Sequence, residues 1–464
     1  MLEPTYQADV VVVGAGTAGL SAARRLTGAG VTTVVLEAAP TVGGRMATEK
    51  VDGFRLDRIG QLLSTAYPEL RPAAGLDGLV LRPFAPGVLL HSDGRHHRAG
   101  VSVGTKGARG ALHAVRALAS APRAGAAPRR PVAVPGRQVS APRSRTGAPL
   151  GTAVDQARLG AAFTRLAGTP VERLLARPEL TAAEALVARG LPARTVDGFL
   201  RPLLAALLCD PDLTTSSRCA DLALRAFAAG RLCLPEGGAE ALPELLARGL
   251  PPGTLRTGVR VTSVSTTSVT TAEHGEFRCR AVLIATDARA AAQLLPGLRV
   301  PDFHPVTVVH HATDEPPETG ASLLLDADRG GPVAHTAVVS RVDPSRAPAG
   351  RALVSSTVLG PPGTQVDTGV RVHLSRLYGM STARWETLAV HHTADAVPAT
   401  PPPHDLRRPV RLLAGLYVCG DHRDTSTVQG ALHSGHRASA AILADLGADR
   451  PLHTADPLPT ARAA

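Results

Sequence analysis

Short runs of hydrophobic residues, many of them β-branched, predict a series of buried strands along the chain. Residues 9–13 form such a run, and they lead directly into a glycine-rich turn. A helical pattern follows over 20–26, and a second strand is expected over 32–36. Strand, helix and strand within about thirty residues predict a βαβ unit near the N-terminus, and therefore a parallel sheet.

The hydrophobic pattern changes twice further along the chain. Helical periodicity predicts helices over 153–166, 171–177, 181–190, 196–209 and 217–229, and Thr181 and Glu184 have the spacing of a capping box. Strand-like runs lie at 257–264 (as a strand pair), 281–286, 306–311, 334–339, 352–359 and 416–421. We therefore expect a region of mixed helices and strands beside the parallel sheet.

The composition is that of a globular protein, with 44% hydrophobic and 19% charged residues. The five cysteines show no C-x-x-C spacing, which argues against a disulfide framework or a zinc ribbon. No run approaches the ~18 apolar residues that span a bilayer, and no basic leader with an apolar core precedes the first strand. We expect a cytoplasmic protein.

The formal net charge of +11 is concentrated in one segment. Residues 101–150 contain one lysine, eight arginines and no acidic residue. We interpret 121–150 as a basic flexible insertion, and the whole of 101–150 is either a solvated segment or a weak contact with an anionic membrane surface. Nucleic acid is not expected as a partner, because this segment has no aromatic residue on which bases could stack. Residues 448–464 have the character of a tail.

The glycine-rich turn has the spacing of a dinucleotide-binding motif. Gly14 permits a tight turn, Gly16 lets the backbone approach a pyrophosphate, and Gly19 lets the helix pack closely on the strand. The helix N-terminus offers unpaired N–H groups to the phosphates. Glu37 ends the second strand, where a carboxylate accepts hydrogen bonds from ribose hydroxyls and disfavours the 2′-phosphate of NADP. The predicted dinucleotide-binding residues of this unit are Gly14, Ala15, Gly16, Ala18, Gly19 and Glu37.

These residues lie in the stretch GAGTAGLSAARRL, which is followed by VVLEAAPTVGGR. Together the two stretches resemble the extended FAD fingerprint of the superfamily of flavin amine oxidases, phytoene desaturases and protoporphyrinogen oxidases. The resemblance implies FAD as the cofactor. It covers roughly 8–446, with further blocks around 53–62, 234–239, 257–264, 281–286 and 416–432.

The resemblance also implies which other residues contact FAD. In the family the arginine of the Gly-Gly-Arg sequence, here Arg45, contacts the phosphate side, and the Gly-Asp pair contacts the ribitol and pyrophosphate. The helix after this pair directs its N-terminus at the pyrimidine end of the flavin, where its partial positive charge stabilises the anion of the reduced ring. The residues carried over are Gly44, Arg45, Gly60, Gln61, Val261, Gly420, Asp421, Val428 and Gln429.

The implied fold class is α/β, with a discontinuous Rossmann-like FAD-binding domain and an α+β substrate-binding domain. The FAD-binding domain is expected to comprise 1–99, 234–300 and 410–447. The substrate domain is expected to comprise 100–233 and 301–409.

The substrate side leaves alternatives open. Amine-oxidising members of the family usually have a lysine near flavin N5 and an aromatic cage, whereas this chain has no lysine after Lys106 and only 3% aromatic residues. We therefore expect hydride transfer from an apolar, isoprenoid-like or polycyclic substrate to flavin N5, as in phytoene desaturases. A flavin amine oxidase and a non-enzymatic lipid or prenyl carrier of the same architecture are the alternatives.

No catalytic residue and no metal-ligand set are assigned from the sequence. His310 and His311 lie on an expected strand, so one should face the core and the other the solvent. The same expectation applies to His391 and His392.

Overall fold

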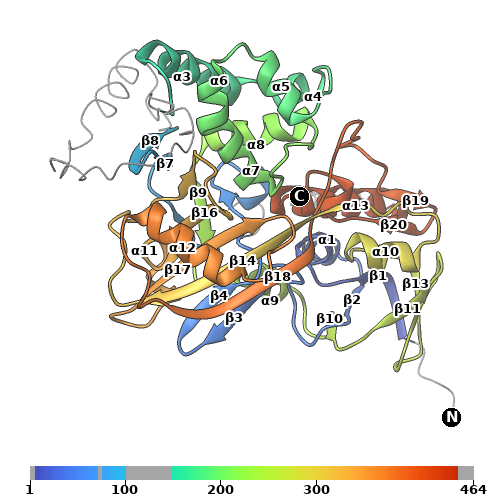
Figure 1. The fold of residues 1–464 in the computed structure, drawn as a ribbon. Helices are drawn as coiled ribbons and strands as arrows, with labels where there is room; N and C mark the ends of the chain where they lie inside the picture. The colour runs from blue at the N-terminus through green and yellow to red at the C-terminus, as the bar shows by residue number, and fades with distance from the viewer. Residues whose placement is uncertain (1–5, 72–75, 101–148, 448–464) are drawn as a thin grey trace, which may run out of the picture.

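The structure is a computed structural model that describes residues 6–71, 76–100 and 149–447 (Figure 1). Segments 101–148 and 448–464 lie outside the described residues, so the basic insertion and the tail stay predictions. Among the helices of the described residues, none is long and apolar enough to cross a membrane.

The first domain is built on an eight-stranded sheet. Its parallel strands are, in order, β10 (Leu255–Thr257), β2 (Thr33–Glu37), β1 (Tyr6–Val13), β13 (Glu276–Ile284) and β20 (Leu416–Val418). β12 (Ser268–Thr271) and β11 (Val261–Val264) continue the sheet antiparallel beyond β13, and β19 (Arg411–Leu413) pairs with β20. The predicted βαβ unit and α/β class are therefore confirmed.

Helices cover both faces of this sheet. α1 (Thr17–Gly28), α13 (Val428–Leu446) and α9 (Ala241–Arg248) lie on the face to which Val10 and Val12 point, and α10 (Ala288–Leu294) lies on the face of Val11 and Val13. These four valines are buried, as expected for a parallel strand covered on both sides.

The second domain contains a seven-stranded sheet. Its order is β18 (Glu386–Pro398), β14 (Phe303–Thr313), β17 (Ala352–Leu359), β16 (Val333–Val338), β15 (Leu324–Asp326), β7 (Val88–Ser92) and β8 (Arg95–Ala99). Helix α12 (Val366–Tyr378) packs on one face of this sheet. A group of helices lies at the top of Figure 1: α3 (Ala153–Gly168), α4 (Val171–Leu175), α5 (Ala182–Ala188), α6 (Ala193–Thr195), α7 (Arg201–Leu208) and α8 (Ser217–Ala229).

Short elements connect the two domains. β3 (Thr48–Val51) pairs with β4 (Phe54–Asp57), and β9 (Leu232–Pro235) pairs with β5 (Leu63–Ser64) and β6 (Leu81–Pro83). The remaining short helices are η1 (Pro68–Leu70), η3 (Val196–Leu200), α11 (Val339–Val342), η4 (Pro344–Arg346) and η5 (Asp421–Arg423). The capping box is confirmed, because Thr181 and Glu184 each accept the other's backbone N–H.

Three local expectations differ from the structure. Residues 88–99, expected in the first domain, form β7 and β8 of the second sheet, where β7 pairs in parallel with β15. The strand pair expected over 257–264 does not form, because Gly258 turns the chain with a φ of +73° and sends β10 and β11 to different partners. His310 and His311 are both buried, because β14 is covered on both faces.

Candidate functional site

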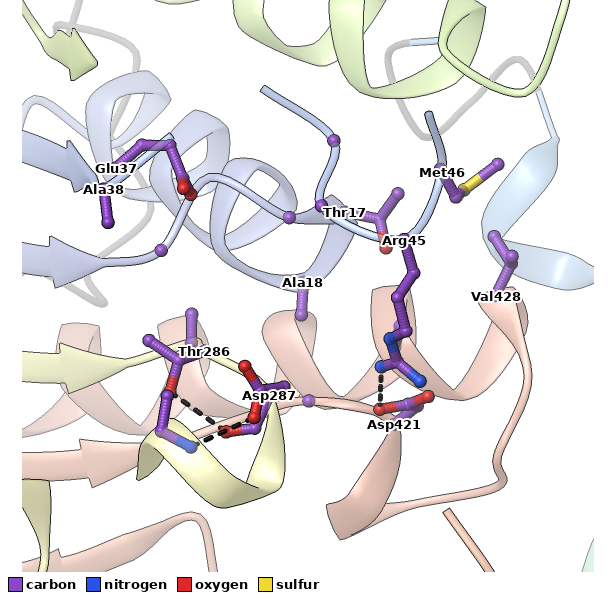
Figure 2. A pocket seen from close by; sticks show the side chains of 18 of the residues that line it. Thr17, Ala18, Glu37, Ala38, Arg45, Met46, Thr286, Asp287, Asp421 and Val428 are labelled. Carbon is purple, nitrogen blue, oxygen red and sulfur yellow. Dashed lines mark hydrogen bonds and ion pairs between the residues drawn. The ribbon is translucent and has the colours of Figure 1, made fainter. Parts of the chain in front are cut away.

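A cavity of about 640 Å³ lies at the carboxyl ends of the parallel strands β1, β2 and β13 of the first domain, and Ala396 of β18 in the second domain also lines it. Figure 2 shows Glu37 at one end of this cavity and Met46 and Val428 at the other, with Arg45 and Asp421 between them. In open parallel sheets, ligands bind at this edge, where helices begin and strands end. The cavity is therefore the candidate site.

The glycine turn forms one wall of the cavity. Gly14 has a φ of +106°, and a Cβ atom there would lie 2.8 Å from the carbonyl oxygen of Ala285. A Cβ at Gly19 would lie 2.1 Å from the carbonyl oxygen of Gly14, so this glycine is required for α1 to pack against the turn. A Cβ at Gly16 would meet no atom within 4 Å and would project into open space.

The N-terminus of α1 faces the cavity with its polar groups uncapped. Gly16 is the N-cap residue, and no side chain accepts from the first turn. Thr17 and Ala18, the first residues of the helix, line the cavity. Unpaired N–H groups and the helix dipole together favour an anion such as a pyrophosphate at this position.

Glu37 fixes the end of the cavity next to the second strand. Its Oε2 accepts from the backbone N–H of Ala15 at 2.7 Å, and its Oε1 accepts from the N–H of Ala39 at 2.8 Å. Each carboxylate oxygen keeps a lone pair with which it can accept from a ribose hydroxyl. Val261 lies on the same part of the wall, on the edge strand β11.

An ion pair joins two walls in the middle of the cavity. Arg45 Nη2 lies 2.6 Å from Asp421 Oδ1, and Arg45 Nη1 donates to the carbonyl oxygen of Ala396 at 2.8 Å. Burial alone would lower the pKa of Arg45, but the adjacent Asp421 carboxylate outweighs burial and raises it. The guanidinium is therefore a permanent cation beside the N-terminus of α1.

Several aliphatic side chains line the cavity. Ile59, Leu63 and Leu234 lie on its wall together with Val428, which begins α13, and Gln61 adds a polar side chain that donates to the carbonyl oxygen of Ser426. Behind Ile59 lies an apolar cluster that contains Cys209, Val306, Val308, Ala396 and Val397. Among the described residues that line the cavity, none is a lysine, a histidine or an aromatic residue.

Asp57 is a carboxylate on the wall, but its oxygens have partners within the protein. Oδ1 accepts from the N–H of Ala239 and the hydroxyl of Thr48, both at 2.8 Å. Oδ2 accepts from the buried guanidinium of Arg346 at 2.6 Å. Asp57 therefore holds the turn after β9 against the cavity.

The structure places most of the residues predicted from the sequence around this one cavity. Those on its wall are Gly14, Gly16, Ala18, Glu37, Gly44, Arg45, Gln61, Val261, Gly420, Asp421 and Val428. Ala15, Gly19, Gly60 and Gln429 are not on the wall. Ala15 and Gly19 support the turn from behind, and the side chain of Gln429 accepts from the N–H of Glu69 instead.

Sequence analysis did not single out other wall residues as site residues. Thr286 and Asp287 follow β13, and Asp287 caps α10 by accepting from the N–H groups of Arg289 and Ala290. These two residues could have been identified from the sequence, because they follow a predicted strand and the carboxyl ends of neighbouring parallel strands meet at one edge of a sheet. Met46 and Leu63 carry no such signal.

The histidine pairs lie outside the cavity wall. His310 Nε2 is 3.0 Å from the carbonyl oxygen of Asp57, and burial lowers the pKa of His310 to about 4. His391 lies 2.8 Å from a Glu49 oxygen, whereas His392 is exposed. The expectation of one inward and one outward histidine is therefore confirmed for 391–392 and wrong for 310–311.

The residues on the wall fit a flavin dinucleotide. A ribose acceptor, an uncapped helix N-terminus, a cation and aliphatic side chains follow one another along the cavity in the order that the parts of FAD require. The open space at Gly16 lies where a pyrophosphate would approach the backbone.

Comparisons with known proteins agree with this geometry. The sequence model of the flavin containing amine oxidoreductases matches residues 17–443. A putrescine oxidase from Kocuria rosea is 45% identical over 100 residues, which are 20% of this chain and 20% of that protein. A pseudooxynicotine dehydrogenase from a Pseudomonas species is 38% identical over 69 residues, 15% of this chain and 14% of that protein. These matches span about a fifth or less of the relatives' length.

Solved structures share the fold over nearly the whole chain. A putrescine oxidase bound to putrescine superposes with a TM-score of 0.65 at 18% identity, covering 95% of this chain and 100% of that one. A structure from Exiguobacterium, provisionally named a protoporphyrinogen oxidase, gives 0.64 at 18% identity, with 96% and 100% covered. At this level of identity, the likeness establishes the fold.

Proposed function

Because the chain belongs to the family of flavin containing amine oxidoreductases, we propose that it is an FAD-dependent oxidoreductase that takes a hydride from an apolar, uncharged substrate. FAD is the cofactor of this family. The observation that supports the substrate class is the group of aliphatic side chains on the cavity wall, Val428, Ile59, Leu63 and Leu234. The reaction and the substrate are our proposals.

Physical chemistry disfavours a cationic amine beside these side chains. Transfer of an ammonium group from water to an apolar wall is costly unless a carboxylate or an aromatic face receives it. The described wall has no aromatic side chain, and two of its carboxylates, Asp57 and Asp421, are already paired with Arg346 and Arg45. An aliphatic hydrocarbon gains about 25 cal/mol per Å² of surface buried against the same wall.

Different residues of the cavity wall would bind and orient different parts of FAD. Bound FAD supplies a ring position that accepts a hydride from a C–H bond. Glu37 and the N-terminus of α1 would hold the ribose and phosphates at one end. Arg45 and Asp421 would hold the middle of the dinucleotide, and the N-terminus of α13 would offer its partial positive charge to the flavin. The aliphatic side chains of the wall would exclude water.

Amine oxidation is a second candidate function. The local identity of 45% to a putrescine oxidase favours it, and a cyclohexylamine oxidase shares the fold with a TM-score of 0.60. A carboxylate on the wall could receive an ammonium group if the Asp57–Arg346 pair opened. The two candidates therefore differ in whether the substrate carries a charge.

Anaerobic bleaching of the flavin tests the proposal. The purified flavoprotein would be mixed without oxygen with carotenoid precursors, porphyrinogens, putrescine or cyclohexylamine, and the visible flavin absorption would be followed. We expect bleaching by a carotenoid precursor, which is an uncharged isoprenoid, and none by either amine. Bleaching by a porphyrinogen alone, whose propionate groups are anionic, would show that the substrate is not uncharged. Bleaching by amines alone would establish the second candidate and overturn the first. A Gly16→Ala protein, expected to lack FAD, controls for substrate absorption.

A further inference from the structure

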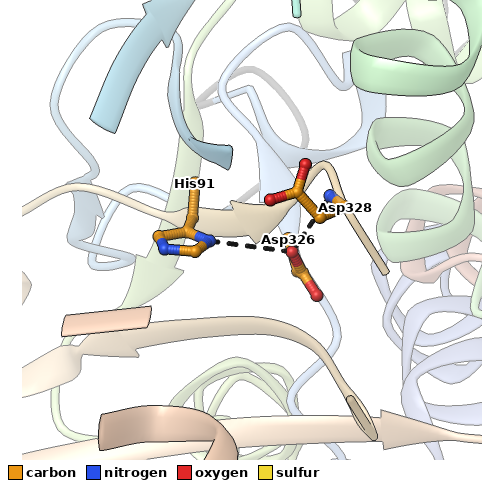
Figure 3. Close-up of side chains that lie close together, drawn as sticks. All are labelled: His91, Asp326 and Asp328. Carbon is orange, nitrogen blue, oxygen red and sulfur yellow. Dashed lines mark hydrogen bonds and ion pairs between the residues drawn. The ribbon is translucent and has the colours of Figure 1, made fainter. Parts of the chain in front are cut away.

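Three potential metal-binding side chains lie together outside the cofactor cavity. His91 comes from β7, Asp326 ends β15, and Asp328 follows in the next turn. One ligand atom of each residue lies within 4.8 Å of the other two (Figure 3). The three residues do not line the FAD cavity, so the cluster is separate from the proposed active site.

His91 has buried nitrogens that are not hydrogen bonded. Neither Nδ1 nor Nε2 is in contact with solvent, and neither has a hydrogen-bond partner among the described residues. Nδ1 lies 3.8 Å from Asp326 Oδ1, which is too long for a hydrogen bond. Buried polar atoms are nearly always paired, and a neutral imidazole keeps one nitrogen lone pair that can bind a cation.

Asp326 is buried and held in one orientation. Its Oδ1 accepts from the N–H of Asp328 at 3.1 Å, and its Oδ2 accepts from the N–H of Gly330 at 2.6 Å. The ring of His373 lies 3.0 Å from Oδ2. In metal sites, hydrogen-bond donors that do not themselves bind the ion hold the carboxylate ligands in the orientation that the ion requires.

Asp328 is held in the same way from the hairpin of β7 and β8. The hydroxyl of Ser92 donates to its Oδ1 at 2.8 Å, and the N–H of Asp93 donates to its Oδ2 at 2.9 Å. Asp328 is exposed, so solvent can reach the cluster on this side.

The two carboxylates lack a permanent positive charge. In the described part of the chain, Asp326 forms ion pairs only with His91 and His373, and no arginine or lysine pairs with Asp326 or Asp328. A carboxylate as buried as Asp326 is unfavourable unless a cation neutralises it. The cluster therefore combines an unpaired nitrogen ligand with excess negative charge.

We propose that His91, Asp326 and Asp328 bind a divalent transition-metal ion of the Zn²⁺ or Mn²⁺ class. One imidazole with two carboxylates suits these ions, whereas Ca²⁺ and Mg²⁺ take oxygen ligands. Ligand distances of about 2.0–2.2 Å in a tetrahedral arrangement place two ligands of one ion about 3.3–3.6 Å apart. The three ligand atoms lie within 4.8 Å of one another, so the side chains must move closer together by up to about 1.5 Å when the ion binds. The ion ties the β7–β8 hairpin to the turn after β15, whatever the oxidoreductase acts on.

Titration of the full-length flavoprotein with metal tests this site. After treatment with a chelator, Zn²⁺ and Mn²⁺ would be added during isothermal titration calorimetry, and thermal unfolding would be followed with and without metal. We expect one ion per chain and a rise in the melting temperature. Asp328→Asn should weaken binding by about tenfold or more and remove that rise. His274→Gln, at an exposed histidine of the other sheet, should leave both unchanged.

Other results would overturn the proposal. Absence of Zn²⁺ and Mn²⁺ binding by the wild-type protein would exclude the site, and equal binding by wild type and Asp328→Asn would place the ion elsewhere. His91→Gln separates the ion classes: if Ca²⁺ binds more tightly than Zn²⁺ and this variant has no effect, the cluster binds hard cations through oxygen alone. These outcomes are independent of which substrate bleaches the flavin.

Discussion

Gly16 and Gly19 are three residues apart, but they are required for different physical reasons. Gly19 is needed for packing, because a Cβ there would overlap the carbonyl oxygen of Gly14 at 2.1 Å. Gly16 is needed only for a ligand, because its Cβ would meet nothing within 4 Å and its φ of −74° suits any residue. The two positions therefore separate folding from cofactor binding.

We predict that Gly16→Ala folds normally and loses FAD. The added methyl occupies the space through which the backbone approaches the pyrophosphate, so the flavin-free protein should keep its melting temperature while flavin affinity falls by about tenfold or more. Gly28→Ala, in open space at the other end of α1, is the matched control and should retain FAD. The flavin absorbance per chain after dialysis measures the difference. Full occupancy in Gly16→Ala would mean that the pyrophosphate lies elsewhere.

Glu37→Gln should weaken FAD binding by about 1.5–3 kcal/mol, because ribose hydroxyls lose a charged acceptor. Glutamine keeps the size of the side chain but loses the charge, and its NH2 group cannot accept one of the two backbone N–H bonds from Ala15 and Ala39. Titration of flavin-free protein with FAD, followed by fluorescence quenching, gives the affinity. Glu273→Gln, at an exposed turn of the same sheet, should match wild type. If Glu37→Gln also matched wild type, the ribose assignment would fail.

At the scale of elements, η4 of the second domain is joined to β4 and β9 by one buried cation. Arg346 is 2% exposed and binds Asp57, Asp343 and the carbonyl oxygen of Pro235. Removal of one partner from such a network leaves buried charges without compensation, which typically costs several kcal/mol.

Arg346→Met should therefore destabilise the protein by about 3–5 kcal/mol, and it should loosen the turn that Asp57 holds against the cavity. Arg384→Met removes an ion pair with Glu315 whose side chains are 80% and 65% exposed, and it should cost less than about 1 kcal/mol. Urea unfolding of both variants gives the comparison. Equal, small losses would show that the buried network contributes little to stability.

The first sheet could be predicted from sequence because its signals are local. A continuous β-branched run, a glycine turn and an acidic residue at the end of the next strand lie within 9–37. β7 and β8 carry an ordinary hairpin signal at 88–99, and nothing local shows that β7 will pair with β15, more than two hundred residues later in the chain. His310 and His311 are likewise both buried because segments distant in the sequence cover the two faces of β14.

Some residues of the candidate site could likewise be predicted from local sequence motifs, and others could not. Residues of the glycine turn and of the Gly-Asp pair belong to motifs, so their sequence spacing places them at the cavity. Gln429 belongs to a motif as well, but the side chain faces η1, since only the tertiary packing of α13 decides which side of the helix meets the cavity. Met46 and Leu63 are apolar residues without a pattern, and only the fold places them there.

At the scale of the whole molecule, buried neutral histidines make stability depend on pH. Burial lowers the pKa of His310, His335 and His422 to about 4, from 6.5 for an ordinary histidine. Between these values the unfolded chain binds protons that the folded chain does not. Stability from these groups is therefore complete above pH 6.5 and is lost as the pH falls towards 4.

His335→Gln should make the loss of stability between about pH 7 and about pH 5 smaller by roughly 2 kcal/mol, the contribution of one such histidine over this interval. Melting temperatures at about pH 7 and about pH 5 would show a smaller decrease for this variant than for wild type. His392→Gln, at an exposed histidine, should show the wild-type decrease. If the two variants behaved alike, burial of His335 would not contribute to acid sensitivity.

The walls of the cofactor cavity come from both ends of the chain, and this has a consequence during synthesis. Gly14 leaves the ribosome about four hundred residues before Asp421. At about 5–20 residues per second, the delay is roughly 20–80 s. Until α13 has been made, α1 lacks its packing partner and the nascent chain lacks the part of the cavity wall that Asp421 and Val428 form. Flavin loading is therefore a late, post-translational event, and chains that terminate before α13 should be colourless and depend on chaperones.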